Sequence, residues 1–399
     1  MPLRRIVFWS HLVAGTVVGL VVFFLAATGV ALTYERQIVA FAERQAFTVA
    51  ADGRARLDLD ALAAHARDAL GDSASLVLTN DPEGPVQATA GRRDSVFLDP
   101  YTGAALGSGV EGVETFFGTA EQLHRWFALT GDARTIGRFI IDAANLLFLF
   151  ILASGLFLWW PKRWRWPLLK TKLLFRRGLP TAKARDYNWH QVFGIWALLP
   201  LVLIVVSGVV FSYSWANGLV FALYGEATPQ GPGGPPPPGN GQAQQAQGSA
   251  SRTDAGRAAT LAEPVSLDAV FATARAADPA WRTIALALPA AGAPTVTATV
   301  DTGNGVQPAA KTKLAISRAD GSIVSTIGGD ESSAGRRARG WLRFIHTGEI
   351  YGIIGQTVAG LASLATLFLV WTGLSLAWRR LIWPLTRKPP GQAAQRAGG

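Results

Sequence analysis

Cysteine is absent from this chain of 399 residues, and its one methionine is Met1. The lack of cysteine excludes disulfides, thiolate metal sites, iron–sulfur clusters and covalent c-type haem attachment. With methionine only at position 1, methionine ligation of a metal inside the fold is not expected. Any haem in this chain would therefore be non-covalent and held by histidine.

Charged residues are also scarce, at 16% of the chain against 49% hydrophobic residues. Four apolar runs are each long enough to cross a hydrocarbon core, which takes about 20 helical residues. Arg4 and Arg5 precede the first run as in a secretory signal, but its length and the lack of a clear cleavage site indicate an uncleaved anchor. We therefore predict an α-helical membrane protein with four transmembrane helices, on the runs Ile6–Tyr34, Phe139–Trp160, Val192–Tyr213 and Ile350–Trp378.

Basic residues gather in the linker between the second and third runs, where the only acid is Asp186. Such a linker is cytoplasmic by the positive-inside rule, and the arginines before the first run and after the fourth agree with it. We therefore expect both termini in the cytoplasm. The formal net charge of +10 is explained by these flanks at the lipid surface, and no nucleic-acid partner is expected. The basic residues of the linker are Lys162, Arg163, Arg165, Lys170, Lys172, Arg176, Arg177, Lys183 and Arg185.

These patterns predict an order of segments along the chain. Residues 228–259 are rich in proline, glycine and glutamine and are expected to form a disordered tether inside the second extracytoplasmic domain. The expected segments are transmembrane helix 1 (1–34), a periplasmic α+β domain (35–134), helix 2 (135–161), a basic cytoplasmic loop (162–188), helix 3 (189–214), a second periplasmic α+β domain (215–345), helix 4 (346–379) and a cytoplasmic tail (380–399).

The two halves of the chain resemble each other, which predicts an internal duplication. His11-Leu-Val-Ala-Gly15 opens the first run and His190-Gln-Val-Phe-Gly194 opens the third, and Thr28-Gly29 and Ser207-Gly208 follow in the same register. Ser154-Gly155 and Thr372-Gly373 lie at matching places in the second and fourth runs. The soluble segments also match, since helical spacing at 57–70 and 265–277 is followed in each by strand-like sequence.

Four of the five histidines lie one apiece beside the four apolar runs: His11, His124, His190 and His346. Histidine is costly near hydrocarbon and is a common axial ligand of haem iron. Two imidazole nitrogens that share one iron lie about 4 Å apart, so partners must lie at the same depth. We therefore expect His11 with His190 near the cytoplasmic side and His124 with His346 near the outer side, each pair holding one haem. The fifth, His65, has no counterpart and is interpreted as surface or ordinary packing.

Other candidates have an ordinary explanation beside the functional one. Gly15 and Gly194 lie one turn from their histidines, where a flat macrocycle could approach, but small residues are also common at membrane helix contacts. Arginines near each pair could meet haem propionates, but a single one is more often an interfacial residue. Asp142 is interpreted as the partner of Arg138. The arginines are Arg125, Arg134, Arg138 and Arg343 for the outer pair, and Arg4, Arg5 or Arg185 for the inner pair.

The repeated order of span, domain and span resembles the PepSY-associated transmembrane family of bacterial inner-membrane proteins, whose iron-regulated members act in siderophore-iron uptake. The resemblance covers nearly the whole chain. It implies PepSY-like periplasmic domains and a haem-binding ferrisiderophore reductase with two non-covalent, bis-histidine haem b groups. The motifs that carry it are His11-Leu-Val-Ala-Gly15, Leu123-His124-Arg-Trp126, Asn188-Trp-His190-Gln-Val-Phe-Gly194 and Ile345-His346-Thr-Gly348.

The leading hypothesis for function is an oxidoreductase in which electrons enter at the His11/His190 haem, pass to the His124/His346 haem and leave to a ferric siderophore or other ferric chelate. No nicotinamide or flavin fingerprint is present, and 161–188 is too short for a dinucleotide domain. The donor would be a separate cytoplasmic reductase or a membrane quinol. The alternative is a non-enzymatic membrane sensor or peptide-binding regulatory protein. A metal permease is a weaker third hypothesis, because the spans lack a dense file of carboxylates.

Overall fold

The computed structural model describes residues 2–81, 84–91, 94–229, 264–290, 292–305, 307–328 and 333–386. Most of the expected tether, from residue 230 onward, and the tail from residue 387 onward lie outside the described residues. The chain divides into two compact units. One comprises residues 1–38, 112–224 and 335–399, and the other comprises 39–111 and 225–334.

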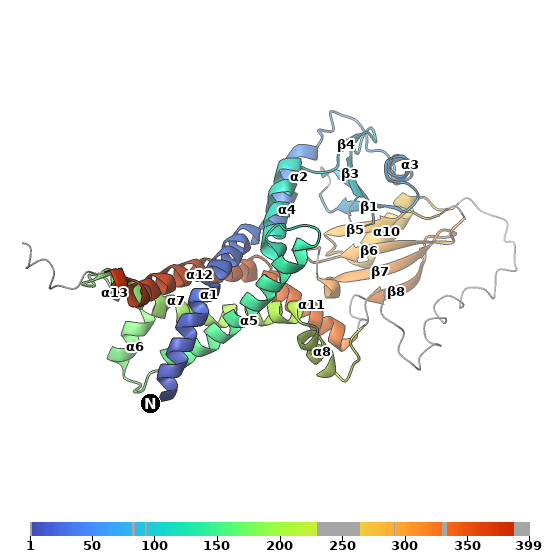
Figure 1. The fold of residues 1–399 in the computed structure, drawn as a ribbon. Coiled ribbons are helices and arrows are strands. Elements are labelled where there is room, and N and C mark those ends of the chain that lie inside the picture. The colour runs from blue at the N-terminus through green and yellow to red at the C-terminus, as the bar shows by residue number, and fades with distance from the viewer. Residues whose placement is uncertain are drawn as a thin grey trace, which may run out of the picture. The chain divides into compact units, whose positions relative to one another are not determined.

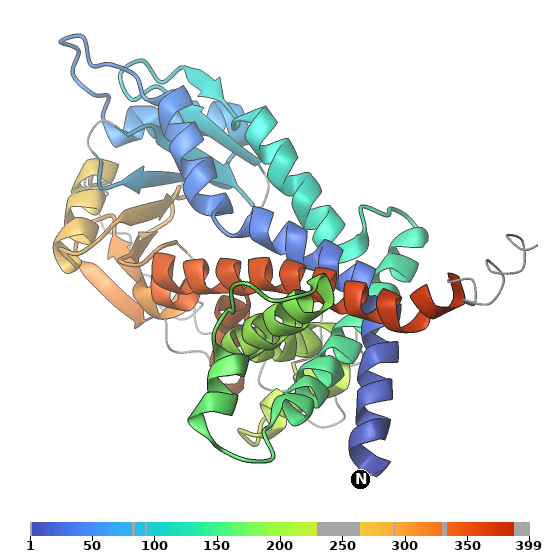
Figure 2. The same cartoon turned by 90° about the vertical axis from the view of Figure 1, so that its left-hand side faces the viewer.

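The first unit is built on four long apolar helices, which confirms the four predicted spans. They are α1 (Pro2–Leu32), α5 (Ala133–Trp159), α7 (Ala182–Ser212) and α12 (Gly352–Leu381). Each packs on two others in the cyclic order α1, α12, α7, α5, so α1 lies diagonally opposite α7 (Figures 1 and 2). The chain is thus a membrane protein whose four spans enclose a common interior.

The surface and the interior of this bundle are both apolar. Leu152, Leu201 and Val205 pack in one buried cluster inside it, whereas Leu20 and Leu199 are more than two-thirds exposed on its outside. A helix that is hydrophobic all round suits a membrane, because lipid solvates the outer face as well as protein solvates the inner one.

Shorter helices accompany the spans of the first unit. Helix α4 (Glu111–Trp126) precedes α5, and α11 (Ala334–Thr347) precedes α12. Gly348, with φ of 76°, forms part of the turn between α11 and α12, and a Cβ there would overlap the backbone of Gly355. The other short helices are α2 (Glu35–Phe47), which the unit boundary divides, α6 (Trp166–Leu173), α8 (Ser214–Ala222) and α13 (Trp383–Thr386).

The second unit is one eight-stranded antiparallel sheet in the order β4-β3-β2-β1-β5-β6-β7-β8. Helices α3 (Leu59–Leu70) and α10 (Leu267–Ala277) pack on it (Figure 1). The strands are β1 (Ala74–Thr79), β2 (Val86–Ala90), β3 (Asp94–Leu98), β4 (Ala105–Gly107), β5 (Thr283–Ala287), β6 (Thr295–Asp301), β7 (Lys311–Ser317) and β8 (Ile323–Gly328).

The two segments that we expected as separate α+β domains share this sheet. Strands β1 and β5 pair with Leu76 opposite Leu286, and both side chains are fully buried in one core that the two segments build together. A four-stranded sheet with one helix buries little apolar surface alone and leaves β1 or β5 as an open edge. Pairing of β1 with β5 gives the two segments one larger core and leaves neither strand as an open edge.

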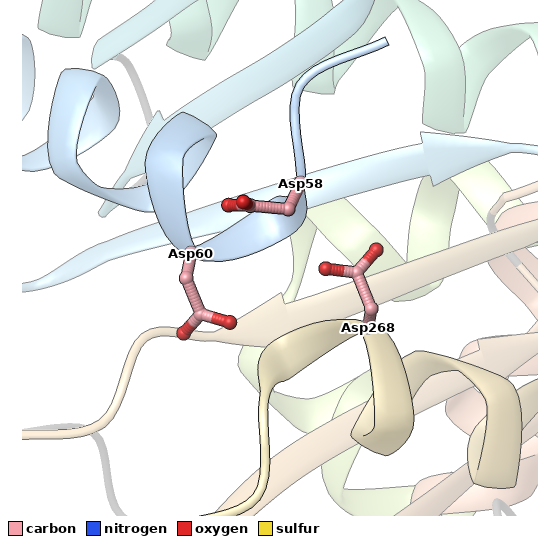
Figure 3. A group of neighbouring side chains, drawn as sticks. All are labelled: Asp58, Asp60 and Asp268. Atoms are coloured by element: carbon pink, nitrogen blue, oxygen red, sulfur yellow. The ribbon is translucent and has the colours of Figure 1, made fainter. Parts of the chain in front are cut away.

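An acidic group joins α3 and α10 at their N-termini. Figure 3 shows Asp58, Asp60 and Asp268 close together there, with carboxylate oxygens within 4.8 Å of one another. Asp60 accepts a hydrogen bond from the Leu267 amide of α10, at 2.8 Å, and Asp268 accepts one from the Leu59 amide of α3, at 2.9 Å. Asp58 caps its own helix. Backbone N–H groups at helix N-termini attract carboxylates, so the cluster is explained as a reciprocal pair of helix caps.

Candidate functional site

The structure places the four predicted histidines on four different helices of the first unit. His11 is on α1 and His190 on α7, whereas His124 is on α4 and His346 on α11. His65 lies exposed on α3 and packs over Gly103, in line with its interpretation as surface or ordinary packing.

His124 and His346 are neighbours. Their ring centres lie 6.4 Å apart and their planes meet at 72°. The rings come from the two helices that precede α5 and α12, so the short turns after α4 and α11 hold them beside the bundle. The structure thus brings together one of the two pairs that depth predicted.

His11 and His190 line one cavity of about 890 Å³ inside the bundle, although they come from diagonally opposite helices. Such a volume lies within the range of small-molecule and cofactor sites, roughly 300–1,000 Å³. A Cβ at Gly15 would meet nothing within 4 Å, so this part of the wall is open, as is expected for a surface facing a flat ligand. The glycines in the wall are Gly15, Gly19, Gly155, Gly194 and Gly373.

Each of the four histidines bonds through Nδ1 to a hydroxyl on a neighbouring span. His11 bonds to Ser154 at 2.9 Å and His190 bonds to Thr372 at 3.0 Å. His124 bonds to Thr28 at 2.8 Å, and His346 bonds to Ser207 at 3.0 Å. One arrangement is therefore repeated four times, with the ring on one helix and the hydroxyl on another.

A glycine follows each of these hydroxyl residues in the sequence: Gly29, Gly155, Gly208 and Gly373. A Cβ at Gly155 would lie 3.3 Å from Cε1 of His11, and one at Gly373 would lie 3.2 Å from Cε1 of His190. The missing side chain lets the imidazole approach the helix backbone. The sequence repeat had marked all four hydroxyl–glycine pairs, but nothing in it identified them as histidine partners.

One end of the cavity is cationic. Arg4, Arg5, Lys183 and Arg380 line it, and Arg380 also stacks its guanidinium over the Phe8 ring at 4.7 Å. Lys183 on α7 and Arg380 on α12 were not among the candidates from the sequence.

Arg185, which was a candidate for the same role, has a different partner. Its guanidinium bonds to the carboxylate of Asp186 at 2.9 Å, and Arg379 of α12 approaches that carboxylate at 2.8 Å. Asp186 is 1% exposed and also accepts a hydrogen bond from Ser375. This buried cluster joins α7 to α12 one helical turn before His190.

Two further polar groups lie near the cationic end. Trp159 is buried, lines the cavity, and its indole N–H has no hydrogen-bond partner among the described residues. Lys172 on α6 donates to the Trp159 carbonyl, and burial together with the nearby Arg4 lowers the pKa of its ammonium. An unpartnered buried donor beside several cations favours an anionic group on a ligand.

Residues near the other pair are engaged with each other. Arg125 and Arg134 stack on the Trp126 ring at 4.3 and 3.6 Å, and Arg138 lies 3.5 Å from Asp142. The ion pair expected for Asp142 is present.

A protein-family model described as "PepSY-associated TM region" matches residues 8–380. The match includes all four spans and all four paired histidines. A comparison with curated proteins gives no match.

Proposed function

The chain belongs to the PepSY-associated TM region family, and from this membership and its paired histidines we propose that it is a di-haem oxidoreductase of a bacterial inner membrane. It passes electrons from the cytoplasmic side to an extracytoplasmic ferric chelate such as a ferric siderophore, and releases Fe(II) for uptake. The observation that carries the proposal is that His124 and His346 are neighbours and that His11 and His190 line one cavity, all in one four-span unit.

The geometry of the residues fits haem b as the ligand. With metal–nitrogen bonds of roughly 2 Å and ring centres about 1 Å behind the nitrogens, two imidazoles on one iron have their centres about 6 Å apart. The separation of 6.4 Å between His124 and His346 agrees with this value. For the other pair, the fit rests on the cavity of about 890 Å³ and its glycine-lined wall.

The cationic end of that cavity also suits a porphyrin, whose two propionates need charged or hydrogen-bonding partners. Arg4, Arg5, Lys183 and Arg380 would supply positive charge there, and the unpartnered indole N–H of Trp159 would supply a donor. The chain's own residues would therefore both ligate and orient the group.

Bound haem supplies reversible one-electron chemistry, which the protein tunes through its axial ligands and their surroundings. Reduction of Fe(III) to Fe(II) weakens its binding to hard oxygen chelators, so one electron per iron releases the metal. The protein has to hold its histidines at both ends of the bundle and leave the ferric chelate access to the outer end.

Orientation follows from the basic loop between α5 and α7, which we place in the cytoplasm together with both termini. The His11/His190 pair is then the inner one, and the sheet unit lies outside the membrane. The electron donor would be a separate cytoplasmic reductase or a membrane quinol.

We also infer an internal duplication. Spans α1 and α7 each carry a histidine near their start and a hydroxyl–glycine pair 17 and 18 residues later, and α5 and α12 each carry a hydroxyl–glycine pair. In the sheet, β1 to β4 follow one another outward on one side of the β1–β5 pair, and β5 to β8 do so on the other side. This order is consistent with two copies of one segment that has a helix and four strands.

The test is purification from cells supplied with haem, followed by absorption spectroscopy and haem quantification. We expect a Soret band, split low-spin α and β bands and two haems per chain. His190→Ala should remove one haem and His346→Ala the other, and either loss should stop reduction of a ferric chelate across the membrane of proteoliposomes. A folded, colourless protein would overturn the proposal and favour the sensor.

A further inference from the structure

We propose that Thr28, Ser154, Ser207 and Thr372 are positioning residues that hold the four histidines as Nδ1–H tautomers and so leave each Nε2 lone pair free for a metal. The tautomer is a property of the polypeptide alone. Its consequence for iron rests on the proposed function.

The four hydroxyl protons are donated to backbone carbonyls of their own helices. A serine or threonine hydroxyl has one proton to donate and two lone pairs to accept with. Ser154 and Thr372 each donate to the carbonyl four residues earlier in their own helix, at 2.7 Å in both cases, and Thr28 does so at 2.9 Å. Ser207 donates to the Ile204 carbonyl, three residues earlier, at 2.7 Å. With its proton committed to the backbone, each hydroxyl can only accept from Nδ1.

A backbone carbonyl near Nδ1 fixes the position of the imidazole proton in His346. Nδ1 of His346 lies 3.0 Å from the Ile204 carbonyl oxygen as well as 3.0 Å from the Ser207 hydroxyl. A carbonyl cannot donate, so Nδ1 of His346 must carry the proton. The carbonyl three residues before the hydroxyl partner also interacts with the other three histidines, Ile151 with His11, Leu25 with His124 and Leu369 with His190.

The Nδ1–H tautomer determines which ring nitrogen can bind a metal. A neutral imidazole with its proton on Nδ1 has its lone pair on Nε2, which is the nitrogen that remains for a metal. A hydrogen bond donated by the other ring nitrogen orients the ring and raises the basicity of the ligand. A more basic ligand stabilises the ferric form relative to the ferrous form, so the hydroxyls would hold the reduction potential of each haem down.

The glycines after two of the hydroxyls serve the same contact. The ring of His11 lies over Gly155 and that of His190 over Gly373, and a Cβ at either glycine would come within 3.3 or 3.2 Å of Cε1 of the ring. In the His11/His190 pair the hydroxyl–glycine pair thus both bonds the imidazole and lets it approach the neighbouring helix. The space at Gly208 is taken by Asn145 instead of His346, so there only the hydroxyl makes the contact.

The tautomer can be tested without any haem. In protein purified without haem and labelled with ¹⁵N-histidine, solid-state NMR separates a protonated ring nitrogen from an unprotonated one by chemical shift. We expect the four paired histidines to give signals of the Nδ1–H tautomer. Signals of the Nε2–H tautomer from these four would overturn the proposal, whatever the protein does with haem.

The effect on ligation is tested with Thr372→Val, which keeps the shape of the side chain but removes its hydroxyl, and with Thr372→Ser as the matched control. Loss of a group that orients a metal ligand typically weakens metal binding roughly 10- to 100-fold. We expect a loss of haem affinity of that size at one site in Thr372→Val and near-normal affinity in Thr372→Ser. If the loss falls tenfold more on the ferric form, the potential of that haem rises by about 59 mV.

Ser154→Ala with Ser154→Thr as control repeats the test on the other ligand of the same pair, should Thr372→Val fail to fold. Equal potentials and affinities in the hydroxyl-free variants and their controls would overturn the role of the hydroxyls. If the protein binds no haem at all, the proposed function is wrong. The NMR result would still show which tautomer the four histidines adopt.

Discussion

Gly155 and Gly373 lie directly beneath imidazole rings, and this close approach makes single residues decisive at the His11/His190 pair. A Cβ added at either position meets Cε1 of a histidine at 3.3 or 3.2 Å, so the ring has to shift by a few tenths of an ångström even for alanine. The larger side chain of valine requires a larger shift, which strains the hydrogen bond to the hydroxyl partner.

We therefore expect Gly155→Val to displace His11 and to lower the haem content of purified protein from two toward one per chain. The measurement is haem per protein by the pyridine haemochromogen method. Gly118→Val is a matched control, because a Cβ at Gly118 on α4 meets nothing within 4 Å. Full haem content in Gly155→Val would contradict the close contact described between Gly155 and the His11 ring.

Asp186 is the second residue for which a large effect is expected. It is 1% exposed and faces Arg185 and Arg379, whose side chains are 49% and 29% exposed. Breaking a buried ion pair costs about 3–5 kcal/mol, and the partial exposure of the arginines places Asp186→Ala near the lower end. Thermal unfolding in detergent should show a clearly lower Tm. Glu121→Ala, which breaks an exposed pair with Arg125, should change it little, since such pairs contribute roughly 0.3–0.5 kcal/mol. Equal shifts in the two variants would contradict this account of Asp186.

At the scale of elements, helices α3 and α10 are linked through their own caps. Asp60 caps α10 and Asp268 caps α3, so each segment of the sheet unit completes a helix in the other. The exchange adds to the β1–β5 pairing and accounts for the clustering of the acidic side chains.

Asp60→Ala and Asp268→Ala should each destabilise the protein by about 1 kcal/mol, the usual value of an N-cap. Because the two caps connect the same pair of helices, the double variant should lose less than the sum of the single losses. Because the chain has 14 tryptophans, the three variants are compared by chemical denaturation of fluorotryptophan-labelled protein, in which ¹⁹F NMR resolves the signal of Trp281, packed against the sheet core. A strong increase in wild-type stability on adding Ca²⁺ would argue for a metal site instead.

The sequence predicted the elements better than their assembly. The ends of the four spans and the bounds of helices α3 and α10 lie within a few residues of expectation, because periodicity and length are local signals. Helices α5 and α7 begin six and ten residues before their expected starts, since their first turns are polar and lie outside the apolar runs. His124 and His346, which the sequence paired by depth, are neighbours in the structure. The joining of two expected domains into one sheet was missed, since the β1–β5 contact links residues about 200 positions apart and leaves no mark in either strand.

The histidine partners were missed for a related reason. The hydroxyl–glycine pairs stood out as repeat markers, but their link to a histidine depends on which helices become neighbours in the bundle. The same holds for Arg380, which reaches the cavity from the far end of the chain.

At the scale of the whole molecule, the absence of cysteine makes the proposed orientation directly measurable. Lys170→Cys on α6 and Arg275→Cys on α10 each introduce the only thiol, at positions exposed in the structure. In intact spheroplasts, a membrane-impermeant maleimide should label the cysteine at 275 and leave the one at 170 unlabelled until the cells are opened. The reverse labelling pattern would show that the protein has the opposite orientation in the membrane.

The central β1–β5 pairing also has a consequence for biosynthesis. Strand β1 is complete once residue 79 has left the ribosome, but its partner is not made until residue 287. During that interval β1 is a bare edge, open to pairing with a neighbouring nascent chain. Any slowing of translation between the two strands should therefore increase aggregation, and a chaperone that shields strand edges would be needed most at that stage.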